Sequence, residues 1–123
     1  IGNMVELKDL LGKTMKSVEN VENIVIVFTP LEGPQYKLYH EQDCCEVVEV
    51  EDVIGDLEDL VGDPILMAEE VTNHTGPGTF RRSCTWTFYK FATIKGYVTV
   101  RWCGESNGYY SEEVSFAEVP KNE

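Results

Sequence analysis

The chain is short of positive charge. It has 10 Lys and Arg residues against 22 Asp and Glu residues, which gives a formal net charge of −12 at pH 7. Because sequence-independent binding to nucleic acid depends on Lys and Arg contacts with phosphates, this balance disfavours direct binding to DNA or RNA. It favours a basic protein partner, or occupation of a protein site that normally holds nucleic acid. An acidic surface that serves only solubility would explain the same composition.

Long apolar runs are also missing. No stretch reaches the roughly 20 apolar residues that a membrane-spanning helix needs, and no signal-peptide pattern precedes Met4. We therefore expect an intracellular protein without a membrane partner. Met4 is expected to be the natural start, with residues 1–3 left over from an expression tag. At 123 residues, the chain is expected to fold as a single domain, residues 1–123, around its own core.

The four cysteines lack the C-x-x-C spacing that is typical of zinc sites. Cys44 and Cys45 are adjacent, and neighbouring side chains of a strand point to opposite faces, so these two cannot easily share one ion. A disulfide is not expected in an intracellular chain. The sequence therefore predicts no metal site and no cofactor.

Signals of catalysis are sparse. The chain has neither a phosphate-cradling glycine loop nor a serine elbow. The remaining candidate is a nucleophile–base pair of Cys44 and His40, with Asp43 to orient the base. The acidic neighbours Glu41 and Glu46 would raise the pKa of a thiol, which is the wrong direction for a nucleophile. We predict no enzymatic activity and keep a Cys-His enzyme as a third possibility.

Residues 84–116 predict three consecutive antiparallel strands. Lys95-Gly96 and Asn107-Gly108 are two-residue turn signals, since Gly and Asn accept positive φ at low cost. Aromatic and β-branched residues flank both turns, as strands prefer. With Lys95 and Gly96 as the loop, the face expected to lie against the core pairs Tyr89 with Trp102, Phe91 with Val100 and Thr93 with Val98.

The opposite face of this predicted hairpin places Lys90 beside Arg101, with Trp86 and Phe88 close by. One interpretation is a solvated ladder of cross-strand charges, with Glu112 of the third strand diagonal to Arg101. The other is an anion subsite, in which two cations lie over an aromatic floor and bind a phosphate or nucleotide. Both interpretations are open at this stage.

The first half of the chain predicts a short helix and four strands. Residues 5–12 have a helical apolar spacing that stops at a glycine. Residues 13–19 and 23–29 predict strands, and the second is apolar enough to lie centrally in a sheet. Residues 36–41 and 44–50 predict a hairpin with one wet face, which carries Glu46, Glu49 and Glu51.

The segment that begins at Leu57 repeats the one that begins at Leu7, at a constant offset of 50 residues with seven identities over 17 positions. We infer a tandem duplication of a short helix and about four strands, with pseudo-repeats at about 4–53 and 54–119. Packing about a pseudo-twofold axis would give an α+β fold of about eight mostly antiparallel strands and two short helices. Chance similarity between two amphipathic turns is the alternative.

Residues 73–83 have no counterpart in the first pseudo-repeat. This insertion contains Arg81 and Arg82, the only adjacent basic pair. A cationic insertion on an acidic protein is a candidate contact loop. An ordinary hairpin tip is the other interpretation.

Four stretches of the chain are distinctive: YHEQDCCEVVEV, GDLEDLVGDPILMAEEVTN, WTFYKFATIKGYVTVRW and GESNGYY. They resemble a family of small uncharacterised proteins encoded in bacteriophage genomes and prophages, over about residues 36–114. The resemblance implies expression in the host bacterial cytoplasm during infection. It carries over no catalytic or binding residue.

Two classes of function compete. The preferred hypothesis is a non-enzymatic phage accessory protein that binds a host macromolecule, most readily a host protein, through the acidic surface concentrated in residues 43–70. A counter-defence role belongs to this hypothesis. The alternative is a small-ligand binder that sequesters an anionic or nucleotide ligand with Trp86, Phe88, Lys90 and Arg101. Exposed aromatics permit either a monomer or a homodimer.

Overall fold

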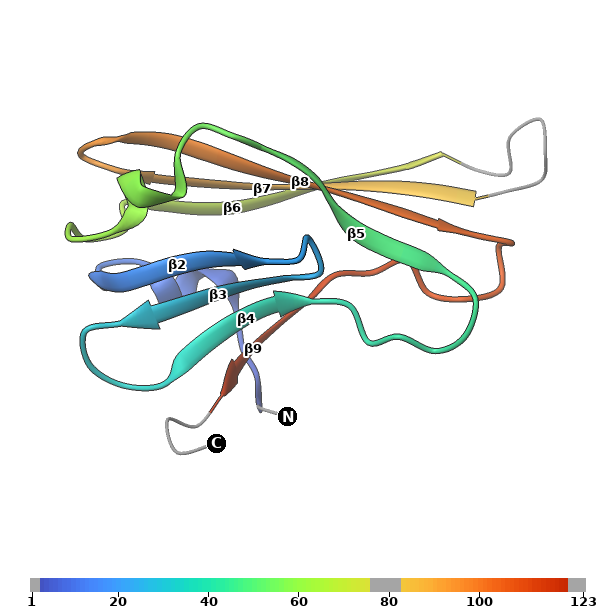
Figure 1. The fold of residues 1–123 in the computed structure, drawn as a ribbon, viewed down its shortest axis with the longest axis horizontal. Helices are drawn as coiled ribbons and strands as arrows, with labels where there is room; N and C mark the ends of the chain where they lie inside the picture. Colours follow the sequence, from blue (N-terminus) through green and yellow to red (C-terminus); the bar gives the residue numbers. More distant parts are fainter. Residues whose placement is uncertain (1–2, 76–82, 120–123) are drawn as a thin grey trace.

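The protein consists of two antiparallel sheets that pack face to face (Figure 1). The computed structural model describes residues 3–75 and 83–119. The strand order is β1-β9-β4-β3-β2 in the first sheet and β5-β8-β7-β6 in the second. The first sheet contains β1 (Asn3–Met4), β2 (Met15–Val21), β3 (Val25–Pro30), β4 (Gln35–Tyr39) and β9 (Ser115–Val119). The second contains β5 (Val47–Ile54), β6 (Met67–Thr75), β7 (Ser83–Thr93) and β8 (Gly96–Ser106).

The core lies between the sheets, because the strands alternate inward and outward side chains. Phe28 of β3 and Phe91 of β7 meet across the interface, with ring centroids 5.2 Å apart. Tyr36 of β4 stacks on Phe116 of β9 at 5.5 Å. Other fully buried side chains include Ile26, Leu38, Val98, Val100 and Trp102. Apolar residues of both sheets therefore form one hydrophobic cluster.

Two 3-10 turns, η1 (Leu7–Leu10) and η2 (Leu57–Leu60), accompany the sheets. They confirm the two short helical segments predicted from the sequence, although neither is an α-helix. Leu10 and Leu60 are fully buried and anchor the turns in the core. No helix among the described residues is both long and apolar enough to cross a membrane.

The segment that follows η1 and the segment that follows η2 are hydrogen-bonded to each other. Gly12, with φ of +83°, donates its N–H to the carbonyl oxygen of Ile65 at 2.9 Å. Gly62, with φ of +91°, donates its N–H to the carbonyl oxygen of Met15 at 3.0 Å. Both glycines occupy left-handed backbone that other residues adopt only with strain. These hydrogen bonds therefore stabilise the segments that follow the two turns.

The strands follow the same path in both halves of the chain. β2, β3 and β4 form a meander in the first sheet, and the next strand, β5, then pairs with β8 of the second. β6, β7 and β8 form a meander in the second sheet, and β9 then pairs with β4 of the first. The two connections are the β4–β5 crossover (residues 40–46) and the β8–β9 crossover (residues 107–114). Each half thus supplies one strand to the other half's sheet.

This exchange overturns two predictions. The hairpin predicted for residues 36–41 and 44–50 is wrong, because β4 and β5 lie in different sheets. The third consecutive strand predicted after Asn107-Gly108 is also wrong, because the chain leaves β8 there and pairs with β4 instead. In both places a buried glutamate, Glu46 or Glu112, holds the connection between the sheets.

The β7–β8 register differs from the prediction by two residues. Ile94 and Lys95 form the turn, so that Thr93 pairs with Gly96 and Phe91 with Val98. The Lys95 ammonium contacts carbonyl oxygens at η2, which keeps this residue in the loop. A two-residue shift leaves every side chain on its original face, because strand side chains alternate with period two. The predicted core face is therefore confirmed: Tyr89, Phe91, Thr93, Val98, Val100 and Trp102 are buried.

We expect Leu60→Ala to lower the free energy of unfolding by about 2–5 kcal/mol, because it opens a cavity in the shared core. Urea denaturation measures this change. Leu66→Ala is the matched control, since Leu66 is 64% exposed and its truncation should change stability by no more than about 0.5 kcal/mol. Equal losses in both variants would contradict the role given to η2.

Candidate functional site

The second sheet extends beyond the first at one end. β7 and β8 have 11 residues each, whereas β3 has 6 and β4 has 5. Both crossovers lie beneath this overhang (Figure 1). A cavity of about 460 Å³ lies here, lined by β6, β7 and the β8–β9 crossover. The unequal strand lengths therefore leave part of the inner face of the second sheet open.

Glu112 is a buried carboxylate in this cavity, with 8% of its surface exposed. It accepts hydrogen bonds from the hydroxyls of Thr85, at 2.7 Å, and Ser106. Burial alone would raise the pKa of Glu112, but hydrogen bonds from Ser106, Thr85 and Ser83 outweigh it and hold the pKa below its usual value. Glu112 is therefore ionised at neutral pH.

A glycine permits the close approach of the Glu112 backbone to the sheet. A Cβ atom at Gly104 of β8 would lie 2.9 Å from the carbonyl oxygen of Glu112 and 3.0 Å from its Cβ. Such contacts are too short for two non-bonded atoms, so a larger residue would push the β8–β9 crossover outwards.

Three polar side chains of β6, those of Glu70, Thr72 and His74, face the same cavity. Thr85 donates its only hydroxyl proton to Glu112, so the 2.8 Å contact between its oxygen and His74 Nδ1 is donated by the imidazole. Glu70 accepts a hydrogen bond from the hydroxyl of Tyr89 at 2.7 Å. Burial, followed by the neighbouring Glu70, raises the pKa of Tyr89, which keeps its proton available for this bond.

The cavity is acidic. Its lining includes the carboxylates of Glu70, Glu112 and Glu113, and among the described lining residues there is no Lys or Arg. A second cavity of about 380 Å³ shares Glu70 and Glu113 with the first and continues to Glu6. We call these two cavities together the acidic groove. Its larger part follows the inner side of β6 from Glu70 to His74, and its smaller part continues from Glu70 towards β9 and residues 4–7.

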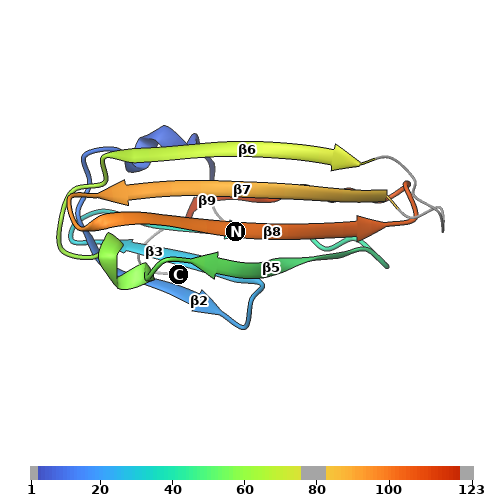
Figure 2. The ribbon, with the colours of Figure 1, turned by 90° about the horizontal axis from the view of Figure 1, so that it is seen from above.

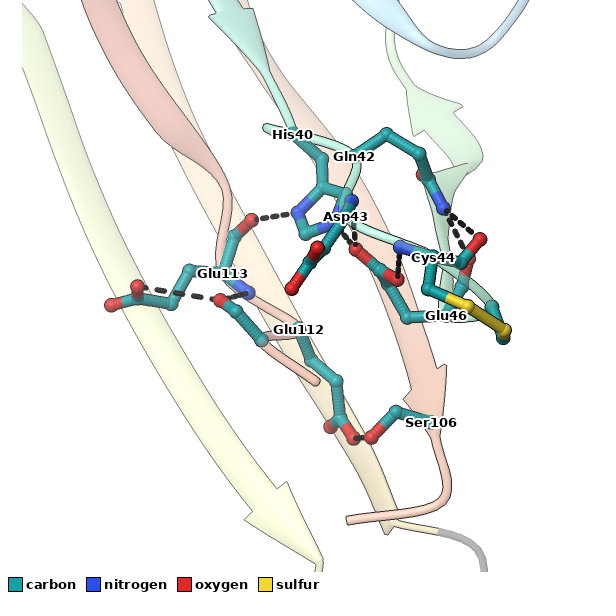
Figure 3. A network of polar contacts seen from close by, with 10 residues as sticks. His40, Gln42, Asp43, Cys44, Glu46, Ser106, Glu112 and Glu113 are labelled. Carbon is teal, nitrogen blue, oxygen red and sulfur yellow. Dashed lines mark hydrogen bonds and ion pairs between the residues drawn. A yellow bond between two sulfur atoms is a disulfide. The ribbon is translucent and has the colours of Figure 1, made fainter. Parts of the chain in front are cut away.

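Beside the groove, a buried ion pair fixes the β4–β5 crossover (Figure 3). The carboxylate of Glu46 accepts hydrogen bonds from His40 Nε2 at 2.7 Å and from the N–H groups of Asp43, at 2.8 Å, and Cys44, at 2.9 Å. His40 Nδ1 lies 2.6 Å from the carbonyl oxygen of Glu113, to which it must donate. The His40–Glu46 pair therefore holds the two crossovers together.

The ion pair also explains the acidity of Glu46. The hydrogen bond from His40 lowers its pKa to about 2, burial opposes this shift, and the N–H groups of Cys44 and Asp43 add to it. The sequence placed Glu46 on a wet face with Glu49 and Glu51. That prediction is confirmed for Glu49 and Glu51, which are exposed, and is wrong for Glu46, which is buried.

The predicted Cys-His pair is not assembled. Both ring nitrogens of His40 contact Glu46 and Glu113, and the sulfur of Cys44 is bonded to that of Cys45 (Figure 3). The predictions of opposite side-chain directions and of no disulfide are thus wrong for these cysteines. They lie in a crossover before β5 begins, where the alternation of a strand does not apply. The absence of enzymatic activity stays a prediction.

Trp86, Phe88, Lys90 and Arg101 lie together on the outer face of the second sheet, as predicted. The direct pairing of Lys90 with Arg101 is wrong, because the shifted register places Phe88 opposite Arg101 and Thr99 opposite Lys90. The role of this face in ligand binding stays a prediction.

The charge of Arg101 already has a partner. Its Nε and a terminal nitrogen lie 2.5 and 2.7 Å from the two carboxylate oxygens of Asp52, in the bidentate geometry of a strong ion pair. The hydrogen bond from Arg101 lowers the pKa of Asp52. Arg101 also lies over the ring of Trp86, 5.5 Å from its centroid. A free anion would have to compete with Asp52.

The structure does not test the predicted contact loop. Arg81 and Arg82 lie outside the described residues. Cys84 and Cys103 have sulfurs 4.0 Å apart. Burial, followed by the neighbouring Cys84, raises the pKa of Cys103 to about 12, so that this thiol is protonated at neutral pH. Within the described ranges no three His, Cys, Asp or Glu side chains gather as a metal site.

A family model described as "Domain of unknown function (DUF7448)" matches residues 8–116. The chain belongs to this family. No curated protein gave a significant match. No solved structure gave one either.

In this DUF7448 protein, sequence reasoning missed the acidic groove. One signal for it was present in β7, where the inward side chains change along the strand from small and hydroxylated to large and aromatic. Ser83, Thr85 and Thr87 carry hydroxyls, whereas Tyr89 and Phe91 face the core. Hydroxyls at alternate positions of a core-facing row indicate a polar cavity rather than packed core.

We expect Glu46→Gln to be less stable than the wild-type chain at about pH 7, with a difference that shrinks as the pH falls. A carboxyl whose pKa falls from 4.5 to about 2 on folding stabilises the fold above its unfolded pKa and loses this effect as the pH drops through its folded pKa. The stabilisation should therefore be lost between about pH 5 and 2. Urea unfolding over this pH range measures it.

Glu49→Gln is the control, because Glu49 is exposed on β5. Its stability should follow that of the wild type across the range. A constant difference between Glu46→Gln and the wild type from neutral to acidic pH would refute the assignment.

Proposed function

We propose that this chain is a non-enzymatic binding protein that takes a positively charged segment of a protein partner into the acidic groove. The observation that carries the proposal is Glu112, a buried and ionised carboxylate in a cavity that also presents Glu70 and Glu113. No Lys or Arg among the described lining residues neutralises these charges.

The hydrogen bonds of the cavity also favour a cation. The hydroxyl protons of Thr85 and Ser106 are already donated to Glu112. What remains open at the carboxylates is acceptor capacity, which an ammonium or guanidinium group satisfies with several N–H donors. The formal net charge of −12 would speed the approach of a basic partner. The outer face is less suited to the alternative anionic ligand, because Asp52 already engages Arg101.

The partner that we propose is a protein of a bacterial host. This part rests on the resemblance to proteins encoded by bacteriophages and prophages. We also propose a location in the host cytoplasm and a counter-defence role, which rest on the same resemblance. Acidic proteins suit such a role, since they can occupy a basic site that normally holds nucleic acid.

The tandem duplication is also part of our proposal. The segments that follow the two 3-10 turns support it. Gly12 bonds to Ile65 and Gly62 bonds to Met15. Gly12 and Gly62 are 50 residues apart, and so are Met15 and Ile65, which is the offset of the sequence repeat. The reciprocal exchange of β5 and β9 between the sheets supports it as well. A pseudo-twofold axis would then relate residues 4–53 to 54–119.

We expect the octapeptide acetyl-(Lys-Thr)4-amide to bind at low ionic strength, with an affinity that falls as salt is added. The double variant Glu70→Gln/Glu113→Gln should weaken binding by about three- to tenfold, as exposed ion pairs do. Isothermal titration calorimetry measures the affinities. Gln at position 70 can still accept the bond from Tyr89.

The matched control is Glu19→Gln/Glu49→Gln, which removes the same charge from exposed positions of β2 and β5. It should change the affinity by less than about twofold. Equal weakening in both double variants, or equal binding of acetyl-(Ser-Thr)4-amide, would show that the groove is not a site for cations.

A further inference from the structure

β6 is an edge strand that is protected only in part, by contacts with η1 and by the charges of Glu69 and Glu70. It lies at the margin of the second sheet, and one of its sides pairs with β7 while the other pairs with no strand of the described residues (Figure 2). Nine consecutive pairs, from Met67–Ala92 to Thr75–Cys84, follow one register without a bulge. The strand contains neither Pro nor Lys, and residues 69–74 are exposed. Its free backbone groups are therefore open to another strand.

The other three edges differ from β6. β1 has only two residues. β2 has an irregularity between Met15 and Ser17, and β5 has one between Val50 and Asp52. Short edge strands and bulges are ordinary means of preventing strand addition. Of the edges described, β6 alone pairs over nine residues without an irregularity.

The acidic groove lies along this same strand. Glu70, Thr72 and His74 are the inward side chains of β6, and all three line the larger cavity. A strand added to β6 would lie about 4.8 Å from it and would direct every second side chain towards the same face. Basic side chains at alternate positions would then point towards Glu70, Glu112 and Glu113.

We propose that β6 pairs with an extended basic segment of a partner protein, whose backbone extends the second sheet and whose alternate Lys or Arg side chains enter the acidic groove. This inference rests on the proposed function and adds the conformation of the partner. Main-chain hydrogen bonds supply affinity and side-chain subsites supply specificity in such strand addition.

Charge selects a basic segment over a second copy of the chain. Antiparallel pairing of two β6 strands would add the Glu69 and Glu70 carboxylates of one copy to an edge that already carries the same two carboxylates. Each copy also carries a formal net charge of −12. Like charges on paired strands are destabilising, whereas a Lys-rich strand is attracted.

The test compares acetyl-(Lys-Thr)4-amide with two analogues, one N-methylated at every Thr and the other at every Lys. Alternate residues of a strand direct their N–H groups to opposite edges, so each analogue removes the donors of one edge while keeping all four charges. Calorimetry should show that at least one analogue binds about tenfold more weakly than the parent or worse. Amide hydrogen exchange should slow in β6 when the parent peptide binds and stay unchanged in β2.

Unchanged affinity of both analogues would overturn strand pairing and leave the charge-based function intact. Failure of the parent peptide to bind would overturn both. Protection of β6 that rises with protein concentration without peptide, together with a dimer mass in sedimentation, would identify a second copy as the occupant and refute the basic segment. Slowed exchange confined to strands other than β6 would also refute it.

Discussion

Two buried carboxylates hold the fold at the places where the chain passes from one sheet to the other. Each carboxylate is bonded by a side chain six residues earlier in the chain. Glu46 is bonded by His40, which directly follows β4, and Glu112 by Ser106, the last residue of β8. A buried carboxylate is costly unless several donors surround it. Each therefore orders the polypeptide around it, and the two crossovers meet through His40 and the carbonyl of Glu113.

The inward and outward faces of the strands could be predicted from sequence, and the connections between them could not. The faces depend only on alternation, which is why the core assignment of Phe91 and Val100 survived a two-residue error in register. The crossovers depend on what lies far away in the chain. Asn107-Gly108 favours a turn, but it does not determine whether the next strand returns to β8 or continues to β4.

The partner of Arg101 and the acidic groove could not be predicted for the same reason, because both depend on segments that are far apart in the chain. Asp52 could not be identified from sequence as the partner of Arg101, because the sequence predicts β5 beside β4 and the structure pairs it with β8. The groove depends on the different lengths of the two sheets, and no single strand reveals that difference. The hydroxyls of Ser83, Thr85 and Thr87 were visible as an alternating row, but only the overhang shows why they are not covered.

The exchange of β5 and β9 between the sheets has a consequence for the order of events during synthesis. Each sheet needs a strand from the other half, so neither half has its complete set of hydrogen-bonded neighbours by itself. The first sheet acquires its strand between β1 and β4 only when residues 115–119 have left the ribosome. Such long-range pairing makes folding slow and leaves strand edges exposed until β9 is available. A nascent chain of this protein would therefore expose unpaired edges of β1 and β4 to other chains until β9 emerges.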